Sequence, residues 1–156
     1  MIKIRRFCMI LMTIFIILSV LSVAGCGSQK ENNISEGEAI EIVDKLLAED
    51  IFEYEMIEVD NTVTENILKI YEDNVSVLKS YTGDGISAEE ITVVKGNSAK
   101  MRKMCDKYLE DKETNYGSYM PEEAEKINKA VVKQYGEITI ICISKDSKKA
   151  EKIMKN

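Results

Sequence analysis

Two pairs of adjacent acids are the first candidates for acid–base chemistry in the sequence, Glu89-Glu90 and Glu122-Glu123. Two carboxylates that face each other across a cleft could hydrolyse a glycosidic bond. Glu89 and Glu90 fall in an expected strand, where neighbouring side chains point to opposite faces and cannot easily share a proton. Glu122 and Glu123 suit the first turn of a helix, where the helix dipole favours acids. Structural roles are therefore predicted for both pairs.

Histidine is absent from the sequence, so the commonest general base and metal ligand is missing. A serine paired with a lysine remains possible at Ser98, Ser144 and Ser147, but each position is more typical of a helix cap or a strand end. Cys105 and Cys142 lack the histidine partner of a thiol protease, and two cysteines alone do not form a zinc site. The sequence thus predicts no catalytic residue, no metal site, no cofactor and no enzymatic activity.

Tyrosine is the enriched aromatic residue, with seven in the chain and three phenylalanines. Tyr116 and Tyr119 flank an expected loop ahead of Pro121. One interpretation makes these tyrosines half-exposed aromatics of the core. The other makes Tyr116 and Tyr119 a binding surface, because tyrosine offers a large contact area at a low cost in conformational entropy.

The N-terminus has the order of parts found in an export signal. A short basic segment, residues 1–6, is followed by 18 uncharged, mainly apolar residues, 7–24. That length suits either the core of a signal peptide or a minimal membrane-spanning helix. The next residues favour the signal peptide, because Val23-Ala24-Gly25-Cys26 resembles the processing site of bacterial lipoproteins.

The chemistry of this site depends on two properties of its residues. Ala24 and Gly25 are small and give a peptidase access to the backbone, and the thiol of Cys26 is the nucleophile that accepts the lipid. We therefore expect residues 1–25 to be a cleaved signal peptide and residues 26–34 to be a lipidated cysteine and flexible tether. Residues 35–156 are expected to form one domain. Its expected location is the extracytoplasmic face of the cell membrane, held by lipid, with palmitate among the acyl groups.

The charge balance argues against nucleic acid as a partner. The first 25 residues contain three basic residues and no acid, so the rest of the chain has 18 basic and 27 acidic residues, a net charge of −9. Phosphate contacts need clustered lysine and arginine. Residues 31–73 hold 14 acids and two lysines, which indicates either solvated helix surfaces or an acidic face for a cationic partner.

Apolar periodicity predicts five helices and five strands in the domain. The helices are expected at 36–48, 61–71, 98–113, a short stretch from Pro121, and a last stretch from Asp146 or Ser147. The strands are expected at 56–59, 75–81, 86–95, 130–134 and 137–144, with tight turns at 82–85 and 135–136. The expected fold class is α+β, with a small, mainly antiparallel sheet and helices packed on at least one face.

Three of these segments make more specific predictions. The helix at 61–71 should place Val63, Ile67, Leu68 and Tyr71 on its buried side. The strand at 137–144 is apolar on both faces, which is typical of a sheet centre or of a sheet between two layers. Cys105 and Cys142 continue apolar patterns, so both are expected to be buried, unbridged thiols and could lie near each other. A disulfide between them is the alternative, because an exported chain can form one.

The chain resembles a family of exported lipoproteins from low-GC Gram-positive bacteria, grouped as domain of unknown function 4358. The resemblance rests on residues 89–95, on 119–123, and on 128–132 with Tyr135-Gly136, and it spans roughly residues 38–153. One departure is Tyr71-Glu72-Asp73, where a glycine is expected after the tyrosine. The resemblance implies a location in the cell envelope. It assigns no activity and transfers no catalytic residue.

These observations favour a non-enzymatic, membrane-anchored binding or assembly module of the cell envelope, with the membrane and an envelope protein as partners. The alternative is a carboxylate-based envelope hydrolase. A regulatory subunit of another envelope protein has the same sequence features as a binding module. Two buried acids in a cleft would favour the enzyme, whereas an exposed apolar or tyrosine-rich patch would favour binding.

Overall fold

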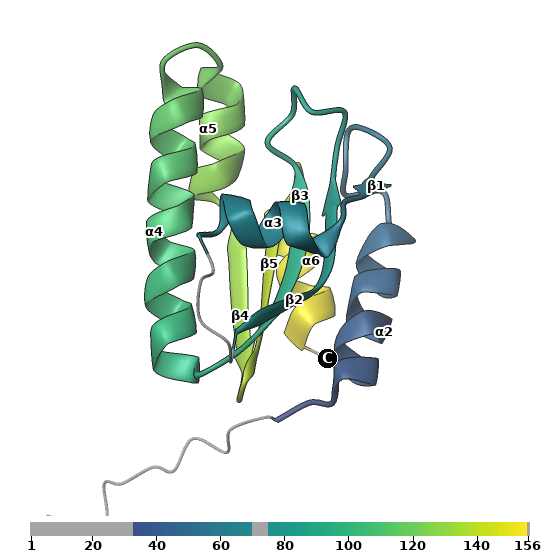
Figure 1. Cartoon of the computed structure of the whole chain (residues 1–156). Coiled ribbons are helices and arrows are strands. Elements are labelled where there is room, and N and C mark those ends of the chain that lie inside the picture. The colour runs from purple at the N-terminus through teal and green to yellow at the C-terminus, as the bar shows by residue number, and fades with distance from the viewer. Residues whose placement is uncertain (1–32, 70–74, 156) are drawn as a thin grey trace, which may run out of the picture. The chain divides into compact units, whose positions relative to one another are not determined.

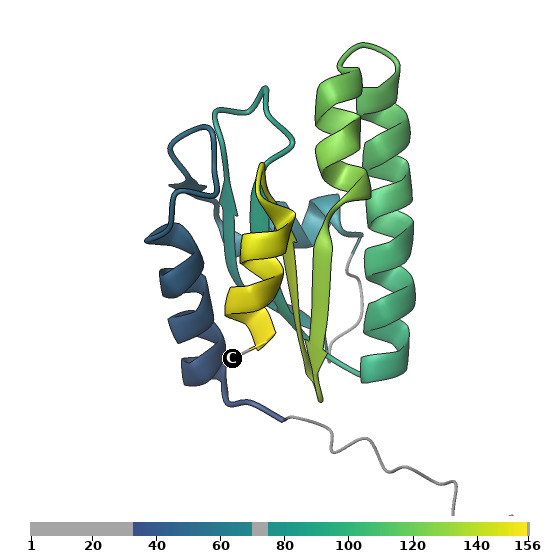
Figure 2. The same cartoon turned by 180° about the vertical axis from the view of Figure 1, so that it is seen from behind.

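The computed structural model describes residues 33–69 and 75–155, in which one antiparallel sheet runs between two layers of helices (Figures 1 and 2). The predicted signal peptide, Cys26 and the predicted tether as far as residue 32 lie outside the described residues. The strands are β1 (Ile57–Glu58), β2 (Ser76–Thr82), β3 (Glu90–Lys95), β4 (Val131–Tyr135) and β5 (Ile138–Ile143). Their order across the sheet is β1-β2-β3-β5-β4, and every neighbouring pair is antiparallel. The predicted α+β class is confirmed.

The helices cover both faces of the sheet. They are α2 (Glu36–Leu47), α3 (Asn61–Ile67), α4 (Ser98–Gly117), α5 (Pro121–Asn128) and α6 (Ser147–Lys155). Helices α2 and α6 share one buried apolar cluster with the sheet, and α4 and α5 share a second cluster on the other face. Each cluster excludes water from one face, so burial stabilises the sheet from both sides.

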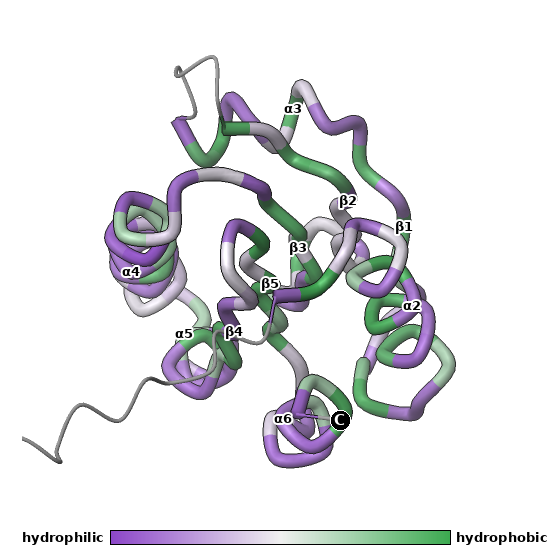
Figure 3. The backbone as a smooth tube through the Cα atoms, turned by 90° about the horizontal axis from the view of Figure 1, so that it is seen from below, coloured by the Kyte–Doolittle hydropathy of each residue, from purple (hydrophilic) through white to green (hydrophobic). Residues whose placement is uncertain are grey.

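Strand β5 has the two-sided burial that its sequence predicts, because all six of its residues are buried. Ile138, Ile140 and Cys142 join the cluster of α2 and α6, whereas Ile141 and Ile143 join the cluster of α4 and α5. Figure 3 shows β3 and β5 running between the helices. Burial of each isoleucine side chain contributes about 1.5–3 kcal/mol.

The two cysteines of the domain are free and buried, as predicted. They do not lie near each other. Cys105 belongs to the cluster of α4 and α5, and Cys142 to the cluster of α2 and α6, so the sheet separates them. Burial raises the pKa of Cys105 to about 11 and that of Cys142 to about 12. Both thiols therefore stay protonated at neutral pH and are poor nucleophiles.

The predicted capping box at the start of α2 is present. The Ser35 hydroxyl accepts a hydrogen bond from the Glu38 amide at 3.2 Å, and Glu38 accepts one from the Ser35 amide at 2.7 Å. Ile34 packs against the cluster of α2 and α6, so the packed part of the chain extends to the last residue of the predicted tether.

Helix α3 differs from its prediction in length and in orientation. It ends at Ile67, and Lys69 has a left-handed backbone with φ of 56° that terminates it, while residues 70–74 lie outside the described part. Leu68 is buried, as predicted, but Val63 and Ile67 are 50% and 56% exposed, and Tyr71 lies outside the described residues. The prediction for Val63 and Ile67 was wrong because Thr64 and Leu68 have the same four-residue spacing, which periodicity over a short helix does not separate.

The observed bounds of β3 and α4 also differ from the predicted ones. Strand β3 begins at Glu90 and not at residue 86, because Asp84 accepts hydrogen bonds from the amides of Ile86 and Ser87, both at 2.9 Å, and holds this stretch in a turn. Gly85 supplies the positive φ, 81°, that the turn requires. Helix α4 continues to Gly117, so Tyr116 lies in a helix and not in the predicted loop.

Candidate functional site

Three loops meet at one end of the sheet and form the loop end, defined as residues 50–56, 83–89 and 117–122 (Figure 1). Each loop exposes one large apolar or aromatic side chain: Tyr54 is 42% exposed, Ile86 is 63% exposed and Tyr119 is 67% exposed. An ideal Cβ built on Gly83 would lie 3.6 Å from the Cβ of Tyr54 and 3.5 Å from that of Ser87, so the first two loops are in direct contact. The exposed side chains therefore belong to one end of the molecule.

Tyr116 and Tyr119 are brought together at this end, but they differ in exposure. Their rings stack with centroids 5.7 Å apart and an interplanar angle of 28°. Tyr116 is half-buried, and its hydroxyl donates a hydrogen bond to the carbonyl oxygen of Ser87 at 3.2 Å. Tyr116 thus joins α4 to the second loop, and Tyr119 is the ring that faces solvent.

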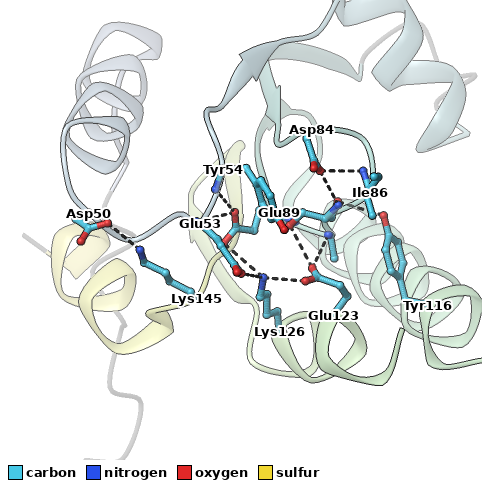
Figure 4. A network of polar contacts seen from close by, with 12 residues as sticks. Asp50, Glu53, Tyr54, Asp84, Ile86, Glu89, Tyr116, Glu123, Lys126 and Lys145 are labelled. Carbon is cyan, nitrogen blue, oxygen red and sulfur yellow. Dashed lines mark hydrogen bonds and ion pairs between the residues drawn. The ribbon is translucent and has the colours of Figure 1, made fainter. Parts of the chain in front are cut away.

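The carboxylate of Glu89 fixes the first loop. Its side chain is completely buried and accepts hydrogen bonds from the amide of Glu53, at 3.0 and 2.9 Å, and from the amide of Tyr54 at 3.3 Å (Figure 4). Lys126 of α5 lies 3.8 Å from the same carboxylate. The amides of Glu53 and Tyr54 lie outside the strands and donate to the Glu89 carboxylate instead of to a neighbouring strand. Hydrogen bonds to a carboxylate are stronger than those to a neutral acceptor.

The carboxylate of Glu123 fixes the second loop from α5. It accepts hydrogen bonds from the Ala88 amide at 2.7 Å and from the Ser87 hydroxyl at 3.2 Å. Lys126 donates to Glu123 and to Glu53, each at 2.8 Å, and so bridges α5 to the first loop. Burial raises the pKa of Glu123, but Lys126 and these hydrogen bonds outweigh burial and leave the pKa below its ordinary value. Glu122 remains exposed, so the two members of this acid pair have different roles.

A second feature lies between α3, α4 and the face of β2 and β3 that they cover. It is a cavity of about 990 Å³ whose lining surface is mainly apolar, and its apolar residues include Leu68, Met101 and Met104. Glu90 also lines it and is only 3% exposed. The two members of this acid pair have different surroundings: Glu90 lines the cavity, whereas Glu89, one residue before β3, accepts hydrogen bonds from amides of the first loop.

Glu90 is fully partnered within the cavity wall. One carboxylate oxygen accepts a hydrogen bond from the Thr92 hydroxyl at 2.6 Å, and the other accepts from Lys112 at 2.5 Å and from the Tyr108 hydroxyl. Burial raises the pKa of Glu90, but Lys112 and the hydrogen bonds outweigh burial and hold the pKa below 4.5, its ordinary value. Burial, together with the Glu90 charge, raises the pKa of Tyr108. Glu90 is therefore an anion at neutral pH and has no proton to donate.

Within residues 33–69 and 75–155, no three or more cysteine, aspartate and glutamate side chains are arranged to hold a metal ion. None of the helices in this part of the chain has the length and apolar character needed to cross a membrane.

Comparison with known proteins identifies one family. A family model described as domain of unknown function (DUF4358) matches residues 49–144. The chain belongs to the DUF4358 family. The match begins two residues after α2 and ends at the residue after β5, so it contains the loop end, Glu90 and Lys112 but excludes all of α2 and all of α6. It is narrower than the span of the sequence resemblance. No curated protein and no solved structure matches the chain.

Sequence reasoning missed the burial of Glu89, Glu90 and Glu123. One signal for it was present in α4. The stripe of Met101, Cys105 and Tyr108 reaches Lys112 at the next helical step, so a lysine was placed on the buried side of an amphipathic helix. A buried lysine requires an acidic partner.

Proposed function

We propose that this member of the DUF4358 family is a membrane-anchored surface lipoprotein of a Gram-positive bacterium, whose domain is a non-enzymatic binding or assembly module of the cell envelope. The processing motif Val23-Ala24-Gly25-Cys26 supports the lipid anchor. An anchor on Cys26 would hold the domain at the extracytoplasmic face of the membrane. Two acyl chains bind a bilayer stably, whereas one chain binds it only marginally.

The loop end is the observation that carries the binding function. Tyr54, Ile86 and Tyr119 are exposed on three loops. Buried carboxylates hold the backbones of the first two loops, and the amides of Tyr119 and Met120 in the third donate to the Tyr116 carbonyl oxygen. A surface that is ordered before binding loses little conformational entropy when a partner docks, which raises affinity. Tyrosine and isoleucine provide the apolar contact area that such a surface needs.

The charge of the loop end indicates the chemistry of the partner. The loop end contains no lysine or arginine of its own, and its exposed acids are Asp50, Glu53, Glu55, Asp84 and Glu122. Lys145 and Lys126 of neighbouring segments pair with Asp50 and Glu53, so Glu55, Asp84 and Glu122 supply most of its negative charge. An apolar patch among acids is complementary to a partner with an apolar contact bordered by basic residues. An envelope protein with such a surface is the partner that we propose.

The hydrolase alternative receives less support from the buried acids. Glu90 and Glu123 each accept a hydrogen bond from a lysine, and the pKa of each lies below its ordinary value. A glycosidase needs one carboxyl group with a raised pKa as its general acid. Glu89 accepts hydrogen bonds from loop amides and Glu90 accepts them from Lys112 and Thr92, so the two carboxylates have separate partners and do not form the facing pair that a glycosidase needs.

Replacing Cys26 with serine tests the anchor. The wild-type chain should incorporate labelled palmitate and fractionate with membranes, because the Cys26 thiol accepts the lipid. Cys26→Ser should incorporate no label and should remain uncleaved or be released. Cys105→Ser is the matched control and should label like the wild type, since Cys105 is a buried core thiol. Equal labelling of Cys26→Ser and the wild type would rule out the lipid anchor.

Photocrosslinking in cells tests the loop end. A photoreactive amino acid placed at Tyr119 or at Ile86 should capture the same envelope protein, because both positions belong to one contact surface. The same group at Glu41, which is exposed on α2, is the control and should not capture it. Glu55→Lys should lower the yield of crosslinked partner from the probe at Tyr119, since the new positive charge would repel the basic residues of the partner. Equal capture from Glu41, or different proteins from the two loop positions, would contradict the proposal.

A further inference from the structure

The cavity between α3, α4 and the sheet has the size and lining of a ligand site. Its volume of about 990 Å³ is at the upper end of the range typical of small-molecule pockets. Leu68, Val75, Met101 and Met104 supply apolar walls. Methionine is flexible and polarisable, so the two methionines can adapt to a chain of variable shape. This lining favours a ligand with a substantial apolar part.

The apolar surface of α3 continues to the mouth of the cavity. Ile67 lines the cavity and is nevertheless 56% exposed. A large aliphatic side chain at the edge of a hollow is stabilised when an apolar ligand covers it, by about 25 cal/mol for each Å² removed from water. An apolar ligand that extends out of the cavity on the α3 side would cover Ile67.

Lysines surround this apolar space. Among the described residues that line the cavity, five are lysines, at positions 69, 100, 103, 107 and 112, and two are acids, Glu90 and Asp111. The Lys112 ammonium group forms an ion pair with the Glu90 carboxylate at 2.5 Å. Asp111 is shared by Lys107 at 3.3 Å and Lys69 at 3.9 Å. The described part of the lining therefore contains more lysines than acids.

We propose that this cavity binds a single-chain amphiphile with an anionic head group. The apolar chain lies between α3, α4 and β2, and a carboxylate or phosphate head lies among Lys103, Lys107 and Lys69. Charged donors bind such oxygens with the shorter and stronger class of hydrogen bond. A free fatty acid and a lysophospholipid share this chemistry. The site is distinct from the loop end, and its occupancy does not depend on the protein partner proposed above.

Photolabelling of the full chain in phosphatidylcholine nanodiscs tests this proposal. The probe is a 16-carbon fatty acid with a diazirine in its chain, and the matched probe is the 16-carbon alcohol with the same diazirine. We expect the acid to label cavity residues such as Met101 and Met104, identified by mass spectrometry, and the alcohol to label them several-fold less. Equal labelling by acid and alcohol would overturn the assignment of an anionic head group. Labels found only outside the cavity lining would overturn the site.

Two variants make the test independent of folding defects. The double variant Lys103→Gln/Lys107→Gln should weaken binding of the acid probe about tenfold, which corresponds to about 1.4 kcal/mol of binding free energy. Lys129→Gln with Lys155→Gln removes the same charge from exposed positions outside the cavity and should have no effect. Met104→Trp, checked for an unchanged thermal transition, should block labelling because it fills the cavity. Unchanged labelling of the first pair would refute the role of the lysines.

Competition identifies the source of the head group. Unlabelled palmitate should displace the probe if the ligand is a free fatty acid, and lysophosphatidic acid should displace it more effectively if the ligand is a phosphate-bearing lipid. Failure of both competitors to displace the probe would show nonspecific labelling and would overturn the proposal.

Discussion

Lys112→Met should lower the free energy of unfolding by about 3–5 kcal/mol, the cost typical of removing one partner of a buried ion pair. The side chains of Lys112 and Glu90 are 14% and 4% exposed, and their charged atoms are 2.5 Å apart. Methionine retains the length of the lysine stem but leaves the Glu90 carboxylate buried without a counter-ion. Urea unfolding, monitored by circular dichroism at pH 7, measures the loss.

The same variant should respond differently to pH. In the wild type the pKa of Glu90 lies below 4.5, so its contribution is fully present above that pH and is lost as the pH falls through the lowered value. In Lys112→Met the burial of Glu90 is no longer opposed by a cation, so its pKa should rise above the unfolded value. Protonation then relieves the penalty, and the difference in stability from the wild type should shrink as the pH is lowered from 7 to 5.

Lys107→Met is the matched control. Lys107 lies on the same helix, and its side chain is 67% exposed in a pair with Asp111 at 3.3 Å. An exposed pair of this kind contributes about 0–1 kcal/mol, so this variant should remain close to the wild type. A loss for Lys112→Met no larger than that for Lys107→Met would mean that the ion pair with Glu90 is not buried.

Glu89→Ala should cost about 2–4 kcal/mol, because it removes the acceptor that satisfies the amides of both Glu53 and Tyr54. Each amide left without a partner loses a charge-assisted hydrogen bond, and the substitution leaves a void beside Lys126. Glu89→Gln keeps one amide oxygen as an acceptor, so its loss should be smaller. Urea unfolding measures the cost, and hydrogen exchange of the Glu53 and Tyr54 amides locates it.

Glu55→Ala is the control for this prediction. Glu55 is an exposed acid of the same loop, and its removal should change stability by no more than about 0.5 kcal/mol. We expect faster exchange at Glu53 and Tyr54 in Glu89→Ala only. If both variants leave the two amides equally protected, the Glu89 carboxylate does not order this loop, and the rigidity attributed to the loop end is lost with it.

Local sequence patterns determined much of the fold. Ser35 and Glu38 predicted the start of α2, because a capping box depends only on residues three positions apart. The six buried residues of β5 predicted a strand between two layers, since alternating side chains report which faces are covered. The prediction for the short α3 was right for Leu68 but wrong for Val63 and Ile67, because these two fit the periodic pattern as well as Thr64 and Leu68 do.

Both candidate sites depend on contacts that no local pattern contains. The loop-end carboxylates Glu89 and Glu123 accept hydrogen bonds from amides 36 and 35 residues away, and Glu90 meets Lys112 across 22 residues. Considered locally, these acids belong on the surface, because an unpaired charge is costly to bury.

The positions of the two cysteines also depend on tertiary packing. The sequence predicts that both Cys105 and Cys142 are core residues. They lie in different clusters because α4 packs on one side of β5 and α2 and α6 pack on the other. The sequence by itself thus determined which segments form helices and strands and which strand is buried on both faces. Which acids are buried, and what each of them holds in place, was decided only when the tertiary structure brought distant amides and lysines to them, because desolvation of a carboxylate is offset only by partners in three dimensions.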